Sequence, residues 1–301
     1  MKISYSAFDT FNRCPLKYKF NYVDRISVPK KPELFFGGLI HEIVQQALKK
    51  DPILPPLDEL LAYLEKNWQE DIFVSPHESQ QYLDFGKTMI KTFHTDFKPG
   101  LRNIVATEKR FIIPLSDKHQ LSGVIDRIDK LPFGSFEVID YKTSKALPTQ
   151  IEVDKDKQLA TYNLAVENLW PKAKDIRLTL YFLKPNMQIT TTRRPDEVEA
   201  IKEELIKTAE KIEKAQEFIP RKNSFCDYCE YGHLCPLMKK DADDAEDLKD
   251  IVKEYILAQQ KIVELEPKIH KHFDKAKIER ISCKNGTLSR GKNKKFSVKK
   301  I

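Results

Sequence analysis

The chain of 301 residues has no long apolar stretch and no apolar segment at its start. No run approaches the roughly 18 residues that a membrane-spanning helix needs. The first residues, MKISYSAFDTFNRCP, have no apolar core of the kind that marks a secretory signal. We therefore expect a cytoplasmic protein without a membrane segment. Because thiols stay reduced in that compartment, the five cysteines suggest a metal site rather than disulfides.

Two familiar motifs are incomplete. The GKT at Gly86–Thr88 resembles the end of a phosphate-binding loop, but the glycine required five places earlier is Gln81. The HEIVQ that begins at His41 resembles a zinc-protease helix, but Gln45 stands where the second histidine is needed. Neither motif therefore supports nucleotide binding or zinc-protease chemistry.

The formal net charge of +7 is unevenly distributed. From Lys268 onwards, 12 lysines and arginines stand against two acidic residues, while an acidic run, DADDAEDLKD, occupies residues 241–250. A basic segment of this kind favours a polyanion such as nucleic acid. A solvated tail would have the same composition, so charge alone leaves both interpretations open.

Periodicity and turn residues predict a mixed α/β fold. The expected helices cover 4–22 (two short helices joined at Cys14–Pro15), 35–50, 58–70, 78–97, 155–170 and 195–215, and the expected strands cover 104–115, 119–131, 135–144, 176–185 and 187–193. Residues 248–273 predict a further helix, kinked or restarted at Pro267. The last residues predict a hairpin that turns at Asn285–Gly286.

Two carboxylates and a lysine stand out in GVIDRIDKLPFGSFEVIDYKTSK, residues 123–145. On a strand, Asp140 and Lys142 project from the same face, and an antiparallel partner strand could bring Asp126 beside them. Two carboxylates near an ammonium form an oxygen site that suits Mg2+, with a cation that can orient a water molecule or a phosphate. An isolated Asp-x-Lys is common and often forms only a surface ion pair, so these residues alone do not decide the chemistry.

Three cysteines near the end of the predicted α/β region form the pattern C-x2-C-x5-C, at Cys226, Cys229 and Cys235. This spacing is typical of metal ligands. Zinc sites and iron–sulfur clusters usually need four ligands, so a fourth is expected elsewhere in the chain. Four thiolates suit zinc and iron–sulfur clusters equally well, so the spacing leaves the metal open.

Six segments, in order, carry a resemblance to a known family: RCPLKYKFNY, FGGLIHEIVQQAL, EKRFIIPLSDKHQLSGVIDRID, VIDYKTSK, QLATY and CDYCEYGHLC. They span roughly residues 4–240 and resemble the PD-(D/E)XK nuclease superfamily, in particular its four-cysteine branch with the RecB/AddB exonucleases and the CRISPR-associated nuclease. The resemblance implies an α/β, restriction-endonuclease-like αβββαβ core with N-terminal helices, in a domain of residues 1–240 closed by a four-cysteine cluster. Residues 241–301 would add a C-terminal helix and a basic β-hairpin.

The resemblance also implies a metal centre. His41, Asp126 and Asp140 match the family's Mg2+ or Mn2+ ligands, and the backbone carbonyl of Tyr141 would add an oxygen. Lys142 matches the lysine that positions or activates water. Asp126, Asp140 and Lys142 would then be the catalytic residues, with Asp140 in place of the commoner glutamate.

DNA-binding roles follow from the same resemblance. Gln158 and Tyr162, four apart on a predicted helix, match a Q-x3-Y element that helps to set the active site and the DNA strand. Beyond the resemblance, a nuclease would need a groove for the DNA backbone, and Arg127, Lys130 and Lys145 could line it. Glu108 resembles an acid on the family's first strand.

The fourth cysteine is also supplied by the resemblance. In the family it lies far upstream, before a proline and an aromatic-rich helix, and that position here is Cys14. Cys14, Cys226, Cys229 and Cys235 would then hold a structural [4Fe–4S] cluster that fastens the N-terminal helices to the segment after the nuclease core. Cys283 has no partner at such a spacing.

We therefore expect a metal-dependent DNA nuclease, by resemblance an exonuclease that prefers single-stranded ends, in DNA repair, recombination or CRISPR-type DNA processing. The sequence has no helicase motif, so a helicase or CRISPR-adaptation partner would provide any unwinding. The alternative from another class is a non-catalytic DNA-binding scaffold subunit of a helicase or adaptation complex, which the presence of Asp126, Asp140 and Lys142 disfavours. A zinc-ribbon regulator would leave these carboxylates unexplained.

Overall fold

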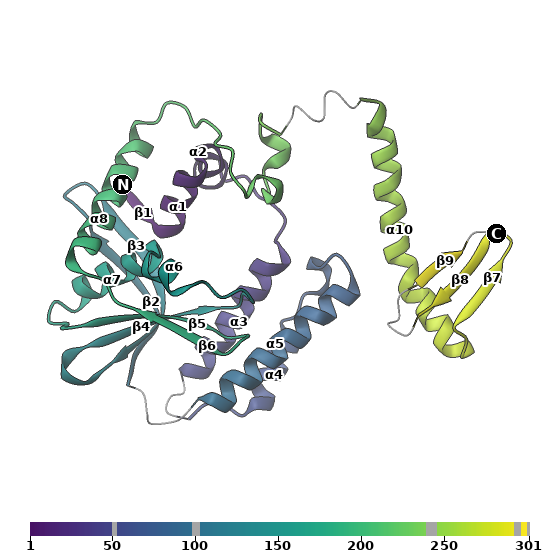
Figure 1. The fold of residues 1–301 in the computed structure, drawn as a ribbon, viewed down its shortest axis with the longest axis horizontal. Helices are drawn as coiled ribbons and strands as arrows, with labels where there is room; N and C mark the ends of the chain where they lie inside the picture. The colour runs from purple at the N-terminus through teal and green to yellow at the C-terminus, as the bar shows by residue number, and fades with distance from the viewer. Residues whose placement is uncertain (50–52, 98–102, 239–245, 292–295, 300–301) are drawn as a thin grey trace. The chain divides into compact units, whose positions relative to one another are not determined.

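The computed structural model describes residues 1–49, 53–97, 103–238, 246–291 and 296–299. These residues fall into two compact units, Met1–Leu237 and Met238–Ile301 (Figure 1). The first unit is a mixed α/β structure, and the second combines one long helix with a small sheet. Among the described residues, no helix is both long and apolar enough to cross a membrane.

Helices and strands of the first unit follow the predicted order closely. Its helices are α1 (Tyr5–Arg13), α2 (Pro15–Tyr18), α3 (Pro32–Leu48), α4 (Leu57–Lys66), α5 (Pro76–Asp96), α6 (Gln150–Asp154), α7 (Lys157–Leu169) and α8 (Pro195–Lys214), with a π-helical turn at Lys19–Val23. Its strands are β1 (Lys2–Ser4), β2 (Ile104–Pro114), β3 (Gln120–Lys130), β4 (Phe136–Lys142), β5 (Ile176–Phe182) and β6 (Met187–Thr191). The predicted helices and strands are confirmed with shifts of a few residues at their ends. The structure adds β1 and α6, which the sequence did not predict.

The local sequence explains where several of these helices begin. Ser4 and Ser75 cap α1 and α5 by accepting a hydrogen bond from a backbone N–H in the first turn. Thr149 and Glu152 form a capping box at the start of α6. Asp156 caps α7 immediately after α6 ends. Capping residues in the local sequence therefore fix where α6 and α7 begin, and so where α7 starts to cross the sheet.

A six-stranded mixed sheet forms the centre of the first unit. Its order is β1–β3–β4–β5–β6, with β2 paired along the other edge of β3. On the shared edge of β3, residues 120–122 pair in parallel with β1 and residues 127–130 pair antiparallel with β4. The described strands leave residues 123–126 unpaired on that edge, so β3 and β4 separate there into a fork.

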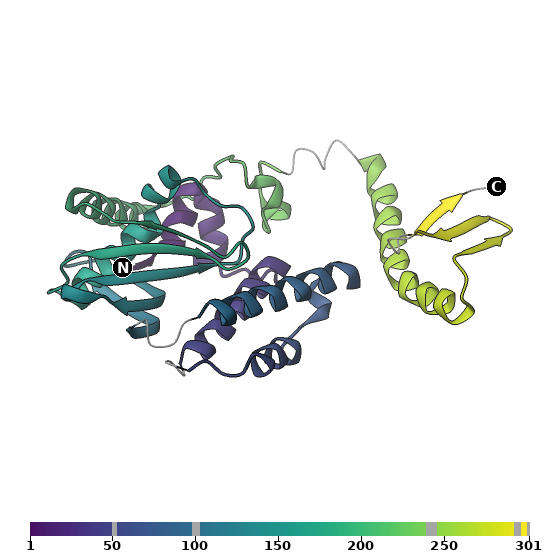
Figure 2. The ribbon, with the colours of Figure 1, turned by 60° about the horizontal axis from the view of Figure 1, so that its bottom comes forward.

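Helices cover both faces of the sheet, as Figure 2 shows for α1 and α8 on one side and α3–α5 on the other. Under α1, α7 and α8 lies one apolar core, which includes Val138 and Leu159. Under α3, α4 and α5 lies a second, which includes Ile40, Ile139 and Tyr141. Successive side chains of β4 therefore point alternately towards α7 and towards α3–α5. The burial of both cores supplies the main stabilisation of this unit.

The second unit consists of α10 (Glu246–Ala276) and an antiparallel sheet of β7 (Arg280–Cys283), β8 (Gly286–Arg290) and β9 (Phe296–Lys299). The predicted helix is confirmed, and it continues as one element through Pro267. The sequence predicted a two-stranded hairpin, whereas the structure has a third strand, β9. Because Cys283 pairs with Gly286, the turn residues are Lys284 and Asn285 rather than Asn285 and Gly286.

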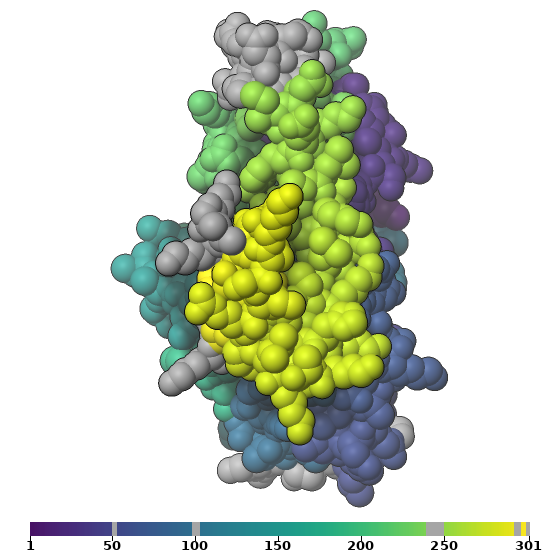
Figure 3. Space-filling view, turned by 90° about the vertical axis from the view of Figure 1, so that its right-hand side faces the viewer, coloured from purple at the N-terminus to yellow at the C-terminus, as the bar shows by residue number. Residues whose placement is uncertain are grey.

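The small sheet packs on the C-terminal half of α10 (Figure 3). The ring of Phe296 lies with its centre 4.3 Å from that of His270 and 5.6 Å from that of Phe273. Within the basic segment, Arg290 forms ion pairs with Asp274 and Glu279 and is only 8% exposed, so it is not free to bind a polyanion. Other basic residues of this segment lie outside the described residues: Lys292, Lys294, Lys295 and Lys300.

Candidate active site

The fork between β3 and β4 places Asp126 beside the end of β4. The Asp126 carboxylate accepts a hydrogen bond of 2.9 Å from the backbone N–H of Tyr141, where the ladder between the two strands has already ended. Asp140 and Lys142 project from the face of β4 that looks towards α7. Lys142 Nζ lies 2.5 Å from Asp140 Oδ2. The structure therefore brings together the two carboxylates and the lysine that the sequence singled out.

Lys142 is one of four side chains that form a closed ring of polar contacts. Lys142 Nζ donates to Gln158 Oε1 (3.1 Å), Gln158 Nε2 donates to the Tyr162 hydroxyl (2.9 Å), and that hydroxyl donates to Asp140 Oδ1 (3.1 Å). The ion pair between Asp140 and Lys142 closes the ring. Gln158 and Tyr162 can act together because they lie one turn apart on α7. The ring holds the ammonium from two sides and fixes its position beside Asp140.

The ring changes the interpretation of Tyr162. Only 5% of its surface is exposed, so its side chain cannot touch a DNA strand as the family resemblance implied. Its hydroxyl contacts Asp140 from the side of α7. Gln158 is half-buried and is bonded at both ends of its amide. Both residues are therefore positioning residues for Asp140 and Lys142.

A second group of ligand atoms includes Asp126. His41 of α3, Glu108 of β2 and Asp126 each offer one atom, and the three atoms lie within 4.8 Å of one another. His41 Nδ1 is 3.3 Å from Asp126 Oδ2. Glu108 stands opposite Asp126, between two cross-strand pairs, and like charges in that position destabilise a sheet. The backbone of Glu108 also has φ of 47°, a conformation that glutamate rarely adopts and that is typical of functional sites.

The pKa values of the cluster report concentrated negative charge. Burial raises the pKa of Glu108, and the charge of Asp126 raises it further. Burial also raises the pKa of Asp140, against the opposing charge of Lys142. Burial lowers the pKa of His41 and of Lys142, but the hydrogen bond to Asp126 and the charge of Asp140, respectively, outweigh it and raise both values. The raised values of His41 and Lys142 therefore report the negative charge of Asp126 and Asp140, whereas those of the two carboxylates report mainly burial.

The residues present fit a divalent cation. Carboxylate oxygens from Glu108 and Asp126, together with the imidazole of His41, are donors that Mg2+ and Mn2+ accept. The predicted ligand Asp140 is not in this group of three, and its oxygens contact Tyr162 and Lys142. Asp140 Oδ2 is buried, and its contact with the ammonium of Lys142 is an ion pair of 2.5 Å without hydrogen-bond alignment. The contribution of the Tyr141 carbonyl stays a prediction.

Replacing Glu108 with glutamine is expected to stabilise the metal-free protein. Burial and Asp126 raise the pKa of Glu108 in the folded protein above 4.5, the ordinary value that applies to the unfolded chain. The stability that the protonated group contributes is therefore fully present below pH 4.5 and is lost as the pH rises through the raised pKa of the folded state. Glu108→Gln should therefore have a higher Tm than the wild type at pH 8, and the difference should shrink as pH falls towards 4.5. Added Mn2+ should raise the Tm of the wild type more than that of the variant.

The test is thermal melting from pH 4.5 to 8, with and without Mn2+. Glu210→Gln, which changes an exposed acid on α8, is the control and should show neither effect. An equal or larger Mn2+ shift in Glu108→Gln would exclude Glu108 as a ligand.

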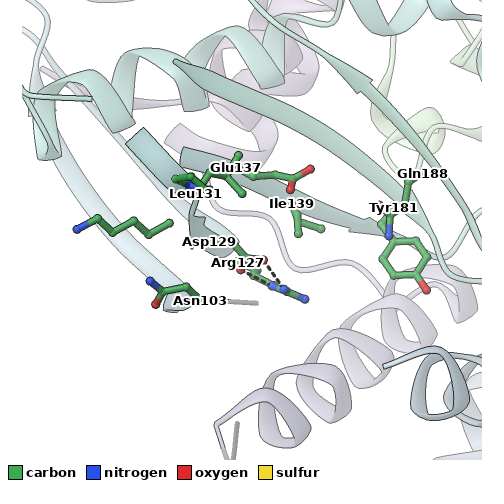
Figure 4. Close-up of a pocket in the computed structure, with 10 residues that line it drawn as sticks. Asn103, Arg127, Asp129, Leu131, Glu137, Ile139, Tyr181 and Gln188 are labelled. Atoms are coloured by element: carbon green, nitrogen blue, oxygen red, sulfur yellow. Dashed lines mark hydrogen bonds and ion pairs between the residues drawn. The ribbon is translucent and has the colours of Figure 1, made fainter. Parts of the chain in front are cut away.

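Arg127 has a structural position in place of the predicted DNA contact. It is 1% exposed, its Nε donates to Asp129 Oδ1 at 2.6 Å, and a second short bond joins Nη2 to Asp129 Oδ2. The pair lines a pocket of about 580 Å3 that Glu137 also lines (Figure 4). Because Glu137 and Asp140 have opposite parity on β4, this pocket lies on the other face from the carboxylate cluster. A buried, paired guanidinium is not free to bind phosphate, so the predicted DNA contact of Arg127 is wrong.

The cysteines lie where the N-terminal helices meet the segment after α8. Cys14 joins α1 to α2, and the other three lie on or beside two single turns: Cys226, Cys229 and Cys235. Burial raises the pKa of the Cys229 thiol, and a smaller contribution comes from Cys14 nearby. Lys17 bonds to Glu230 at 3.1 Å across this junction. Within the described part of the chain, no three of these thiols offer sulfur atoms within 4.8 Å of one another.

Glu108 is the residue of the carboxylate cluster whose role the sequence left open. Its position opposite Asp126 could have been found from the turn between β2 and β3. The backbone of Leu115 bonds to that of His119 at 2.9 Å. Counting seven residues back from Leu115 and seven forward from His119 places Glu108 opposite Asp126. The register of this hairpin therefore predicts the pair once the ends of the turn are known.

The chain is similar to several known proteins. A family model described as the PD-(D/E)XK nuclease superfamily matches residues 2–236. An ATP-dependent helicase/deoxyribonuclease subunit of Streptococcus agalactiae serotype Ia is 29% identical over 152 residues, which are 48% of this chain and 14% of that protein. The protein of the same name from Streptococcus uberis is 24% identical over 193 residues, 60% of this chain and 17% of that protein.

A solved structure, that of SSO0001, is 19% identical, with a TM-score of 0.38, and the match covers 79% of this chain and 86% of that one. The chain thus matches less than a fifth of the length of the two streptococcal relatives. The family model, by contrast, covers most of the chain, from β1 through the carboxylate cluster to the last of the four cysteines. This chain belongs to the PD-(D/E)XK nuclease superfamily.

Proposed function

We propose that this protein is a Mg2+- or Mn2+-dependent deoxyribonuclease that hydrolyses phosphodiester bonds in DNA. The observation that supports this function most strongly is the donor set around Asp126 with Lys142 held beside it. A scaffold that only binds DNA needs neither a strained Glu108 opposite a second carboxylate nor a lysine fixed by a polar ring. Such arrangements are costly to stability, and they are common where chemistry requires them.

The chain's own residues have distinct tasks in this proposal. His41, Glu108, Asp126 and Asp140 would hold the divalent ion, which supplies charge neutralisation at the phosphate and a more acidic water molecule. Burial lowers the pKa of Lys142, but Asp140 outweighs it, so the lysine stays protonated. It therefore acts as a hydrogen-bond donor that orients water or stabilises charge on a phosphate oxygen.

The relatives guide the choice of substrate and partner. They are named as subunits of ATP-dependent helicase/deoxyribonucleases, which supports DNA as the substrate and a helicase as the partner. A helicase delivers separated strands, so we extend the proposal to exonuclease action on single strands with free ends. The direction of digestion, from the 5′ or the 3′ end, will follow from the experiment with end-labelled DNA.

The proposal is tested with single- and double-stranded DNA labelled at the 5′ or the 3′ end. The full chain is incubated with Mg2+, Mn2+ or EDTA, and the products are separated by length. We expect metal-dependent shortening of single strands from one end, and no cleavage in EDTA. DNA binding without cleavage in either metal would favour the scaffold function instead.

We further propose that Cys14, Cys226, Cys229 and Cys235 hold a [4Fe–4S] cluster. The electrostatic effect of Cys14 on Cys229 and the bond between Lys17 and Glu230 support it, because they place the distant cysteine near the segment that carries the other three. The role would be structural, since the cluster would close a loop of more than 200 residues.

Replacing Cys14 with serine is expected to remove iron as completely as replacing Cys229. Both changes take one of four thiolates from the cluster, although the two residues are far apart in sequence. Iron content and absorbance near about 400 nm are measured on protein purified without oxygen. Cys283→Ser, at an exposed cysteine of the second unit, is the control and should keep its iron. Zinc in the anaerobic wild type, or full iron in Cys14→Ser, would contradict the proposal.

A further inference from the structure

Two lysines outside the carboxylate cluster converge on one aromatic ring. Lys145, in the segment after β4, has its Nζ 4.0 Å from the centre of the Phe85 ring. Lys184, just after β5, has its Nζ 3.4 Å from the same centre. Phe85 lies on α5 and packs partly into the core beneath it. Cation–π attraction to this one ring gathers two like charges in one place.

The two charges lack a negative partner in the described part of the chain. No carboxylate there forms an ion pair with Lys145 or Lys184, which interact instead with the Phe85 ring and with each other. Burial lowers the pKa of Lys184, and the adjacent charge of Lys145 lowers it further. Adjacent ammonium groups repel each other, so this arrangement is suited to receiving an anion that would relieve the repulsion.

The pair lies at the edge of the sheet that carries the catalytic lysine. Strands β4 and β5 are parallel, and Lys142 is paired with Phe182 where both strands end. Lys145 follows Lys142 by three residues, and Lys184 follows Phe182 by two. Three residues of chain span at most about 11 Å. Successive phosphates of one strand lie at least about 3.4 Å apart, so this span of main chain corresponds to at most about three nucleotides.

We propose that Lys145 and Lys184 form a binding site for one backbone phosphate of the DNA strand, within about three nucleotides of the bond that is cut. This inference rests on the proposed function and extends it to substrate positioning. Two ammonium groups held side by side can each donate to a different oxygen of one phosphodiester. Phe85 holds them in place before DNA binds, so less side-chain freedom is lost on binding. The site recognises phosphate and carries no preference for base sequence.

The double variant Lys145→Gln/Lys184→Gln tests the site. In EDTA, its Kd for a fluorescent single-stranded oligonucleotide should rise about tenfold over the wild type. The slope of log affinity against log salt should fall by about 0.7, the loss of one phosphate contact on a single strand. Lys172→Gln/Lys174→Gln is the matched control, because it removes the same charge from exposed residues before β5, at the other end of that strand. It should change neither quantity.

A second measurement locates the phosphate. Uncharged methylphosphonate replaces one phosphodiester at a time along the oligonucleotide. In the wild type, one position should weaken binding, and it should lie within about three nucleotides of the cleaved bond. In Lys145→Gln/Lys184→Gln the same replacement should weaken binding little further. The contact between the lysines and this phosphate is already absent, so removing the phosphate charge as well costs no additional binding free energy.

Equal affinities and equal salt slopes for the wild type and the double variant would overturn the inference. An equal loss in the Lys172/Lys174 control would also overturn it, because it would indicate only a general positive field. Failure of the proposed nuclease function gives a different pattern, in which the wild type binds DNA in EDTA but cleaves it with neither metal. In that case, the Kd values and salt slopes of the wild type and the two double variants alone decide whether Lys145 and Lys184 bind a phosphate. A wild type that binds no DNA overturns both.

Discussion

Replacing Lys142 with alanine is expected to slow DNA cleavage at least about 100-fold. The variant loses the ammonium that would orient water or stabilise phosphate charge. It also opens the polar ring, so Gln158 and Asp140 both lose a partner. Burial already raises the pKa of Asp140, and Lys142 is the charge that opposes this shift most. The loss would therefore reach Asp140, a proposed metal ligand, as well as the phosphate.

The measurement is the single-turnover cleavage rate at saturating single-stranded DNA with Mn2+, beside DNA binding in EDTA. Binding should change little in Lys142→Ala, because one half-buried lysine contributes little to the total phosphate contact. Lys172→Ala removes the same charge from an exposed site before β5 and should keep the wild-type rate. A Lys142→Ala protein that cleaves within about tenfold of the wild type would exclude the catalytic role, given the loss expected for such a group.

Replacing Asp129 with alanine is expected to lower the free energy of unfolding by about 3–5 kcal/mol. Asp129 is 4% exposed and Arg127 is 1% exposed, so their two hydrogen bonds lie in the protein interior. Without the carboxylate, the guanidinium stays buried, with the Tyr141 hydroxyl 3.4 Å from Nη1. A buried charge without its counter-ion is strongly unfavourable, so the folded state loses stability.

Urea unfolding measures this loss. Arg127→Met/Asp129→Leu removes both charges and should cost less than Asp129→Ala, because no unpaired charge stays buried. Asp196→Ala, which breaks an exposed ion pair of 3.0 Å with Arg194, should cost less than about 1 kcal/mol. A similarly small loss for Asp129→Ala would mean that water solvates the Arg127 guanidinium.

The long elements could be predicted from the sequence because each contains many residues that obey one period. Strands β2, β3 and β4 and helix α8 occur where alternation and helical spacing placed them. In contrast, β1 has three residues and α6 has five, too few to show a period. The parallel pairing of Lys2 with Gln120 also joins distant parts of the chain, and no local pattern encodes it.

The candidate site was predictable where one element carries the pattern. Asp140 and Lys142 share a strand face, so their proximity follows from the sequence. The burial of Tyr162 and Arg127 follows from how α7 and α3–α5 pack on the sheet, which the sequence alone does not give. The meeting of Lys145 and Lys184 depends on the parallel alignment of β4 and β5, and therefore on the crossover through α6 and α7.

The junction between the N-terminal helices and the segment after α8 has a consequence for biosynthesis. Lys17 and Glu230 are 213 positions apart. At translation rates of roughly 5–20 residues per second, about 10 to 40 seconds separate the appearance of one from that of the other. Contacts between such distant positions also form slowly during folding. Until then, the surface of α2 lacks its native neighbour, so the nascent chain is most vulnerable to aggregation before the segment around Glu230 has been made.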